Sequence, residues 1–168
     1  MLVGLCSDTH DNLDLARSAV ETFEAEGVDA VVHCGDVVAP FTAAVFDAGF
    51  DFHAVRGNND GEWALADTID EFGTYHGESA HLTFDAPDDE VDVAVYHGTS
   101  ERLGAALLDC GTYDYVVRGH THQRTHQERD GTVHVNPGGL PFPGADDAYH
   151  IALLDTDAGD VTFAEVTP

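Results

Sequence analysis

The sequence predicts an α/β fold in which parallel strands come first and antiparallel strands come last. Three observations predict it. In the N-terminal half, short apolar runs alternate with segments of helical periodicity. Each apolar run ends in turn-prone polar residues. Towards the C-terminus, alternating apolar and polar residues flank two glycine turns, a pattern typical of hairpins. The 168 residues are expected to form one domain over 1–168, since this length suffices to bury a single core.

The N-terminal half is expected to form a βαβαβ unit. Residues 1–6 are an apolar strand, and the turn-prone segment SDTHDN leads to a helix over 13–27 that ends at a glycine. A second buried strand at 29–36 precedes a short helix at 39–49, and a third strand within 50–60 runs into a loop. Strands and helices in this order indicate a parallel sheet covered by helices.

The C-terminal half is expected to add a helix and mostly antiparallel strands. In chain order the elements are strands at 78–84 and 91–99 around the acidic turn DAPDDE, a helix at 100–111, a buried strand at 114–122, a hairpin that turns at Asp130-Gly131, and two strands within 149–166. Together with the first half, they predict a layered or sandwiched α/β domain.

The charge is extreme, because 32 acidic residues face only 6 basic ones, all of them arginine, for a net charge of -26. Such a surface repels nucleic acids and anionic membranes, so a nucleic-acid partner is not expected. An apolar content of 43% argues against disorder. The acidity instead favours a halophilic source whose salt screens the repulsion between carboxylates.

No segment resembles a membrane span or a signal peptide, so no membrane partner is expected and the location is predicted to be cytoplasmic. The three cysteines, Cys6, Cys34 and Cys110, form no CxxC pair and lie in or beside apolar runs. They are interpreted as buried, reduced thiols.

Seven side chains that can bind a metal each lie at or after the end of a predicted strand. Carboxyl ends of strands form the ligand-binding edge of open α/β sheets, so these side chains are expected to converge. Residues i and i+2 of an extended segment face one side, which would let the members of each closely spaced pair point together. The seven are Asp8, His10, Asp36, Asn58, His97, His120 and His122.

Seven ligands exceed the needs of one ion, but they suit two divalent ions about 3.5 to 4 Å apart that share a carboxylate. Mixed oxygen and imidazole donors favour Mn, Fe, Co, Ni or Zn over Mg or Ca. The set contains no cysteine, which disfavours a structural zinc site.

The ordered segments SDTHDN, CGDVV, GNND, YHGT and GHTH resemble the calcineurin-like metallophosphoesterase superfamily, with its pattern of DxH, GD, GN, H and GHxH. The short length and the GNND variant are similar to the small archaeal and bacterial phosphodiesterase branch often called the YfcE type. The resemblance covers roughly residues 1–140. It implies a two-sheet α/β/β/α sandwich of mixed parallel and antiparallel strands, and a small phosphodiester as substrate.

The resemblance also implies two ligand sets that share Asp36. One metal would be held by Asp8, His10, Asp36 and His122, and the other by Asp36, Asn58, His97 and His120. A hydroxide between the ions would attack the phosphorus. The candidate catalytic residues are Asn59 and Asp60. Many members of the superfamily carry a histidine where this chain has Asn59, and an asparagine supplies no proton to a leaving group.

Other functions stay open at this stage. The same site could hydrolyse phosphomonoesters, and a scaffold that keeps this fold without catalysis, as the retromer subunit does, is a further alternative. The resemblance implies a homodimer or a higher homo-oligomer. Trp63 and Phe72 could form a lid or a subunit contact, although half-exposed packing is the favoured interpretation.

Single residues have structural alternatives as well. Asp8 or Asp11 could cap the helix that begins near Leu13. His33 is interpreted as a core histidine, with a hydrogen-bonding role near Asp36 as the alternative. No function is assigned to the remaining histidines, which are His53, His76, His81, His126, His134 and His150.

Overall fold

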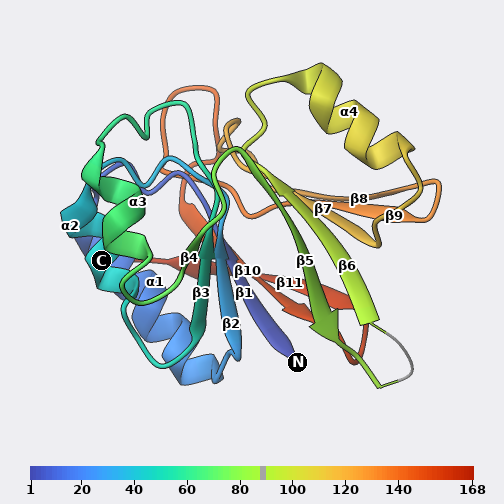
Figure 1. Cartoon of the computed structure of the whole chain (residues 1–168), viewed down its shortest axis with the longest axis horizontal. Coiled ribbons are helices and arrows are strands. Elements are labelled where there is room, and N and C mark those ends of the chain that lie inside the picture. Colours follow the sequence, from blue (N-terminus) through green and yellow to red (C-terminus); the bar gives the residue numbers. More distant parts are fainter. Residues whose placement is uncertain (88–89) are drawn as a thin grey trace.

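Two β-sheets pack face to face, and helices cover both outer faces (Figure 1). The computed structural model describes residues 1–87 and 90–168, so part of the predicted turn DAPDDE lies outside the described residues. The outer face of the first sheet is covered by α1 (Leu13–Glu26), α2 (Pro40–Ala43), the 3₁₀ helix η1 (Ala44–Phe46) and α3 (Ala64–Ile69), and the outer face of the second by α4 (Glu101–Asp109). These layers confirm the α/β/β/α prediction.

The first sheet has six strands in the order β11-β10-β1-β2-β3-β4. Neighbours from β1 to β4 run parallel, whereas β10 is antiparallel to both β1 and β11. The strands are β1 (Leu2–Cys6), β2 (Ala30–His33), β3 (Asp51–Ala54), β4 (Thr74–Tyr75), β10 (Tyr149–Asp155) and β11 (Asp160–Val166).

The second sheet has five strands in the order β5-β6-β7-β9-β8. The pairs β6–β7 and β7–β9 are parallel, and the outer pairs β5–β6 and β8–β9 are antiparallel. The strands are β5 (Ser79–Asp85), β6 (Glu90–Tyr96), β7 (Tyr115–Val117), β8 (Thr125–Arg129) and β9 (Thr132–Asn136).

Alternation along β1 divides its side chains between two cores. Val3 and Leu5 are buried in the layer between the sheets, while Cys6 belongs to the core beneath the helices. Gly4 also faces the helices, and a Cβ added there would lie 2.6 Å from the Phe23 ring of α1. The absence of a side chain therefore lets α1 pack closely on the sheet.

The structure differs from the sequence predictions in several places. The strands β1, β2 and β7 stop at Cys6, His33 and Val117, so the motifs that follow are loops rather than extended segments. Helix α3 was not expected. The cap of α1 is Asn12, whose side chain accepts a hydrogen bond from the Leu15 amide, and neither Asp8 nor Asp11.

Three exposed or half-exposed side chains refine the predictions for the surface. Cys110 is exposed, so the prediction of buried thiols is wrong for it but correct for the other two cysteines. Phe72 packs against the core beneath the helices, as expected. Trp63 is 85% exposed, and the packing interpretation is wrong for this residue because it lies just before α3 rather than on its buried side. Within the described ranges, no helix has the length and apolarity that a membrane crossing requires.

Candidate metal centre

The predicted metal ligands lie on loops whose backbone is unusual. Among the described residues, eight that are not glycine have a positive φ, and five of them are predicted ligands: Asp8, His10, Asp36, His120 and His122. The expectation that closely spaced pairs converge because the chain is extended is therefore wrong. Left-handed turns aim these side chains instead. Such conformations are costly for residues other than glycine and cluster at functional sites.

Asp8 is fully buried, and its two carboxylate oxygens differ. Oδ2 accepts hydrogen bonds from the Ser7 hydroxyl at 2.6 Å and from the His120 amide at 2.9 Å. Oδ1 has no hydrogen-bond partner among the described residues. A buried carboxylate oxygen without a partner is costly, so this atom is well suited to bind a cation.

Two histidines turn acceptor nitrogens towards the carboxylates. Nδ1 of His122 lies 2.6 Å from the Leu140 carbonyl oxygen, and Nδ1 of His97 lies 2.7 Å from that of Cys34. Because a carbonyl only accepts, both Nδ1 atoms carry the hydrogen. In the neutral ring, Nε2 then holds a lone pair, as a metal ligand requires.

These lone pairs face other acceptors. Nε2 of His122 lies 3.2 Å from Asp8 Oδ1, and Nε2 of His97 lies 3.4 Å from Asp36 Oδ2. The same His97 nitrogen is 3.1 Å from Asn58 Oδ1. Facing acceptors repel one another unless a proton or a metal ion lies between them.

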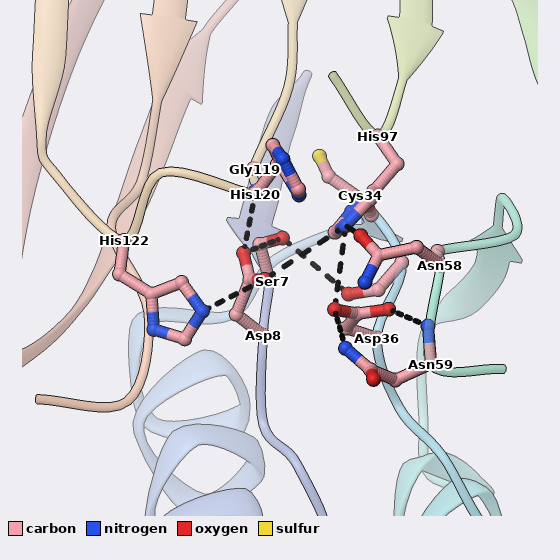
Figure 2. Close-up of polar contacts among 12 residues, drawn as sticks. Ser7, Asp8, Cys34, Asp36, Asn58, Asn59, His97, Gly119, His120 and His122 are labelled. Atoms are coloured by element: carbon pink, nitrogen blue, oxygen red, sulfur yellow. Dashed lines mark hydrogen bonds and ion pairs between the residues drawn. The ribbon is translucent and has the colours of Figure 1, made fainter. Parts of the chain in front are cut away.

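Asn59 forms two hydrogen bonds with the carboxylate of Asp36. The Asn59 amide donates to Asp36 Oδ1 at 2.7 Å, and its side-chain Nδ2 donates to Oδ2 at 2.8 Å (Figure 2). Thus both functional groups of Asn59 that can donate are engaged with the carboxylate predicted to be shared. In this arrangement Asn59 orients Asp36.

Asp60 is buried and joins the two loops that carry Asp36 and Asn58. Its Oδ2 accepts from the amides of Asp36 at 2.9 Å and Gly57 at 2.7 Å, and its Oδ1 accepts from the Val38 amide at 2.7 Å. Burial raises the pKa of Asp60, although these amides act in the opposite direction. Asp60 thus lies behind the candidate ligands and stabilises the two loops that carry them.

Within the described ranges, two groups of potential donors lie close enough together to suit an ion. In each, the candidate ligand atoms lie within 4.8 Å of one another: Asp8, His10 and His122 form one group, and Asp8, Asp36 and His97 the other. His10 Nε2 also lies 3.6 Å from Asp36 Oδ2, which connects the groups. His120 belongs to neither group, but its ring centre is 5.2 Å from that of His97.

The carboxylates and imidazoles shift one another's pKa values. Burial raises the pKa of Asp8, but the imidazoles of His10 and His122 outweigh it and leave the pKa below its usual value. Burial acts likewise on Asp36, whose pKa is nevertheless lowered to about 2, chiefly by His97 and the Asn59 amide.

The histidines respond in opposite ways. Burial lowers the pKa of His97 and of His122, but their carboxylate neighbours outweigh it, so both pKa values are raised. For His120, burial and the nearby charge of His97 leave the pKa lowered. The centre therefore favours ionised carboxylates and attracts positive charge to His97 and His122.

The residues present fit a divalent metal. Asp8 Oδ1 lacks a partner among the described residues, and the fixed lone pairs of His97 and His122 converge on carboxylate oxygens. The mixture of carboxylate, amide and imidazole donors suits a borderline divalent ion.

Some supporting residues were missed by sequence reasoning. Ser7 holds Asp8, and buried Asn136 donates to the Gly119 carbonyl at 2.9 Å, which fixes the loop before His120. The turn-rich segment NPGG was the available signal for Asn136. His33 is a buried core residue as expected, with Nε2 3.1 Å from the Thr9 hydroxyl.

Comparison with known proteins identifies the family. Residues 1–159 match the family model described as the calcineurin-like phosphoesterase superfamily domain. The chain is 34% identical over 166 residues to phosphodiesterase MJ0936 of Methanocaldococcus jannaschii, with 94% of each chain covered.

Solved structures show the same fold. A structure described as a novel archaeal phosphodiesterase has a TM-score of 0.87 and 32% identity, and the match covers 99% of this chain and all of that one. Wild-type Vps29 of Entamoeba histolytica complexed with zinc has a TM-score of 0.70 at 18% identity, over 99% of this chain and 98% of that one, which shows the fold alone. The family model and the 34% identical relative together show that the chain belongs to the calcineurin-like phosphoesterase superfamily.

Proposed function

We propose that this phosphoesterase hydrolyses phosphodiesters with a hydroxide shared between two divalent cations. The observation that carries the proposal is the pair of buried carboxylates, Asp8 and Asp36, faced by the lone-pair nitrogens of His122 and His97. The similarity to a phosphodiesterase of Methanocaldococcus jannaschii supports a diester rather than a monoester.

Each cation would have its own ligands and would share Asp36. We assign Asp8, His10, Asp36 and His122 to the first ion, and Asp36, Asn58, His97 and His120 to the second. When bound, two such ions lower the pKa of a water and stabilise the charge of the phosphoryl group. Mn, Ni, Fe, Co and Zn all suit these donors.

The chain's own residues prepare the site. Carbonyls of Cys34 and Leu140 fix the two imidazoles, Ser7 orients Asp8, and Asn59 orients Asp36. We also propose that Asn59 and Asp60 contribute to catalysis through this orientation of Asp36.

Charge complementarity favours a singly charged substrate. Two divalent cations contribute four positive charges, while Asp8, Asp36 and a hydroxide contribute three negative ones. The remaining single positive charge matches one phosphodiester anion. A phosphomonoester dianion would leave an excess of negative charge in a protein that already carries -26.

Metal-dependent turnover of bis(p-nitrophenyl) phosphate tests the proposal. We expect full-length protein loaded with manganese to hydrolyse this diester faster than p-nitrophenyl phosphate. His97→Ala should abolish turnover, whereas His126→Ala, a change at an exposed histidine of β8, should not. A preference for the monoester would favour phosphomonoesterase activity. Equal background rates in wild-type protein and His97→Ala would favour a scaffold.

We also propose a cellular setting for the enzyme. The net charge of -26 supports a halophilic, cytoplasmic protein, and stability that falls on removal of KCl would agree with it. Indifference of the unfolding midpoint to KCl would contradict it. A homodimer or higher homo-oligomer is a further proposal, which light scattering tests.

A further inference from the structure

A cavity away from the candidate metal centre lies on the outer side of the second sheet, between α4 and the hairpin of β8 and β9. Its volume is about 490 Å³, within the range of small-molecule sites. Its walls include Gly104, Ala105 and Leu108 of α4, and Arg118 and His134 from the sheet side. No ligand predicted for the metal centre lines this cavity.

Arg118 is one of the polar residues that line this cavity. It is half-buried, and its Nε donates to His134 Nε2 at 2.7 Å. Since arginine can only donate, His134 Nε2 must accept, and the imidazole is neutral. Burial and the nearby Arg118 charge lower the pKa of His134 to about 4, in agreement with a neutral ring. The histidine fixes the guanidinium without neutralising its charge.

Among the described residues, Arg118 has no carboxylate partner, although the chain is strongly acidic. In the part of the chain that the structure describes, four of the six arginines form ion pairs and Arg102 does not; the four are Arg17, Arg56, Arg124 and Arg129. Across residues 1–87 and 90–168, Arg118 forms none, and its bond to His134 uses one of five donors. A Cβ at Gly104 would lie 3.7 Å from Arg118 Nη1, so the glycine leaves room beside the guanidinium.

We propose that this cavity binds a small organic molecule through a singly charged oxyanion, a carboxylate or a phosphate ester, held by Arg118. A guanidinium with free, fixed donors matches two oxygens of such a group. Leu108 and Ala105 provide apolar contact for the remainder of the molecule. Glu101 and Glu128 also line the cavity, and Arg129 is paired with Asp109 at 2.7 Å, so a single negative charge is favoured over a higher one.

The proposal is independent of the reaction at the metal centre. Nuclear magnetic resonance of the full-length protein with ¹⁵N-labelled arginine tests it through the six Nε–H signals. Arg118→Lys removes one signal, which assigns it while the charge is kept. Sodium benzoate, methyl phosphate and tetramethylammonium would be titrated separately at constant ionic strength. We expect benzoate, methyl phosphate or both to shift the Arg118 signal to saturation, and the cation to leave it unchanged.

A control arginine distinguishes specific binding in the cavity from nonspecific attraction of anions to any arginine. Arg102 is exposed on α4 and does not line the cavity, so its signal, assigned through Arg102→Gln, is the internal control. Saturation by benzoate alone would assign a carboxylate ligand, and saturation by methyl phosphate alone a phosphate ester. The proposal is overturned if the Arg118 signal does not move, or moves linearly and in parallel with that of Arg102. It is also overturned if the signal shifts equally with tetramethylammonium.

Discussion

The two carboxylates of the candidate metal centre differ in their hydrogen bonding. Asp36 has both oxygens engaged by Asn59, and its backbone amide is held by Asp60. Asp8 has only Oδ2 engaged, and its Oδ1 is buried without a hydrogen-bond partner among the described residues. Both Asp36 oxygens thus accept a hydrogen bond from Asn59, whereas Asp8 Oδ1 accepts none from the described residues.

This difference suggests separate roles: the protein orients Asp36 through hydrogen bonds, whereas Asp8 keeps one oxygen available for a cation. The hydrogen bonds around Asp36 stabilise the metal-free protein, because each satisfied buried group avoids a desolvation cost. The unsatisfied Oδ1 of Asp8 destabilises the folded protein as long as no cation is bound. We therefore expect substitutions of the two carboxylates to have similar effects on activity but opposite effects on the metal-free protein.

The largest effect is expected from Asp8→Asn and Asp36→Asn. Both should abolish metal-dependent diester hydrolysis, since each removes a charged ligand. In chelator-treated protein at alkaline pH, the side-chain amide introduced by Asp8→Asn would place a donor opposite the His122 lone pair, which now lies 3.2 Å from Asp8 Oδ1. We expect a gain of about 1–3 kcal/mol in the free energy of unfolding. Asp36→Asn loses an acceptor for Asn59 and should be destabilised by a similar amount.

Denaturant unfolding with excess chelator measures both changes. If the two variants shift the unfolding midpoint in the same direction, the contrast between Asp8 and Asp36 is wrong. Asp29→Asn is not a neutral control because its carboxylate accepts from the Leu2 amide. Asp67→Asn, at an exposed position of α3, is the matched control.

The second effect concerns Asn59 and the leaving group. An asparagine engaged with Asp36 supplies no proton, so aryl diesters should be cleaved better than alkyl diesters by about 10²–10⁴-fold. Asn59→His should narrow this ratio by raising the rate for alkyl diesters. Steady-state kinetics on both substrates measure it, and equal wild-type rates for aryl and alkyl leaving groups would contradict the prediction.

Asp60→Ala tests whether the hydrogen bonds to Asp60 position Asp36 for metal binding. The change leaves the amides of Asp36, Val38 and Gly57 without their acceptor, and we expect a loss of about 3 kcal/mol in stability. Metal affinity should fall by about 10–100-fold, as for other groups that orient ligands. Calorimetric metal titration at a temperature where the variant is folded measures this, and unchanged affinity would show that Asp60 supports the fold alone. Asp60→Asn keeps one acceptor oxygen, so its stability and metal affinity should lie between those of the wild-type protein and Asp60→Ala.

The smallest effect is the dependence of stability on pH. The raised pKa values of His97 and His122 stabilise the metal-free protein below about 6.5, and this contribution is lost as pH rises through the raised values. The lowered pKa values of Asp8 and Asp36 stabilise it above about 4, and this contribution is lost as pH falls, towards about 2 for Asp36.

Metal binding should reverse the first of these trends, because a cation requires neutral imidazoles. The difference in melting temperature between loaded and chelated protein should therefore grow from pH about 5.5 to about 8. Scanning calorimetry at a series of pH values checks this. A difference that is constant or shrinks with pH would indicate that these histidines are not ligands.

Much of the fold followed from local pattern in the sequence. Parallel strands, hairpins and the main helices were recognisable because burial and turn residues leave a direct periodic signal. The short helix α3 and the exposure of Trp63 were missed, since neither depends on a local pattern. The seven candidate ligands were identified by their position after strands, but their left-handed backbone was not foreseen.

Most of the supporting contacts could not be predicted because they join segments far apart in the chain. The Cys34 carbonyl is 63 residues from His97, and the His120 amide is 112 residues from Asp8. Backbone carbonyls and amides carry no sequence signature. Asp60 was recognised as a candidate, but its role as an acceptor for three amides became visible only in the folded chain.

The most direct test is anomalous diffraction from crystals of the full-length protein grown with manganese. Two peaks about 3.5–4 Å apart are expected, both within bonding distance of Asp36 and one of them beside Asp8 Oδ1, which has no partner among the described residues. No peak at these carboxylates, or a single ion that does not contact Asp36, would contradict a centre built around a shared carboxylate.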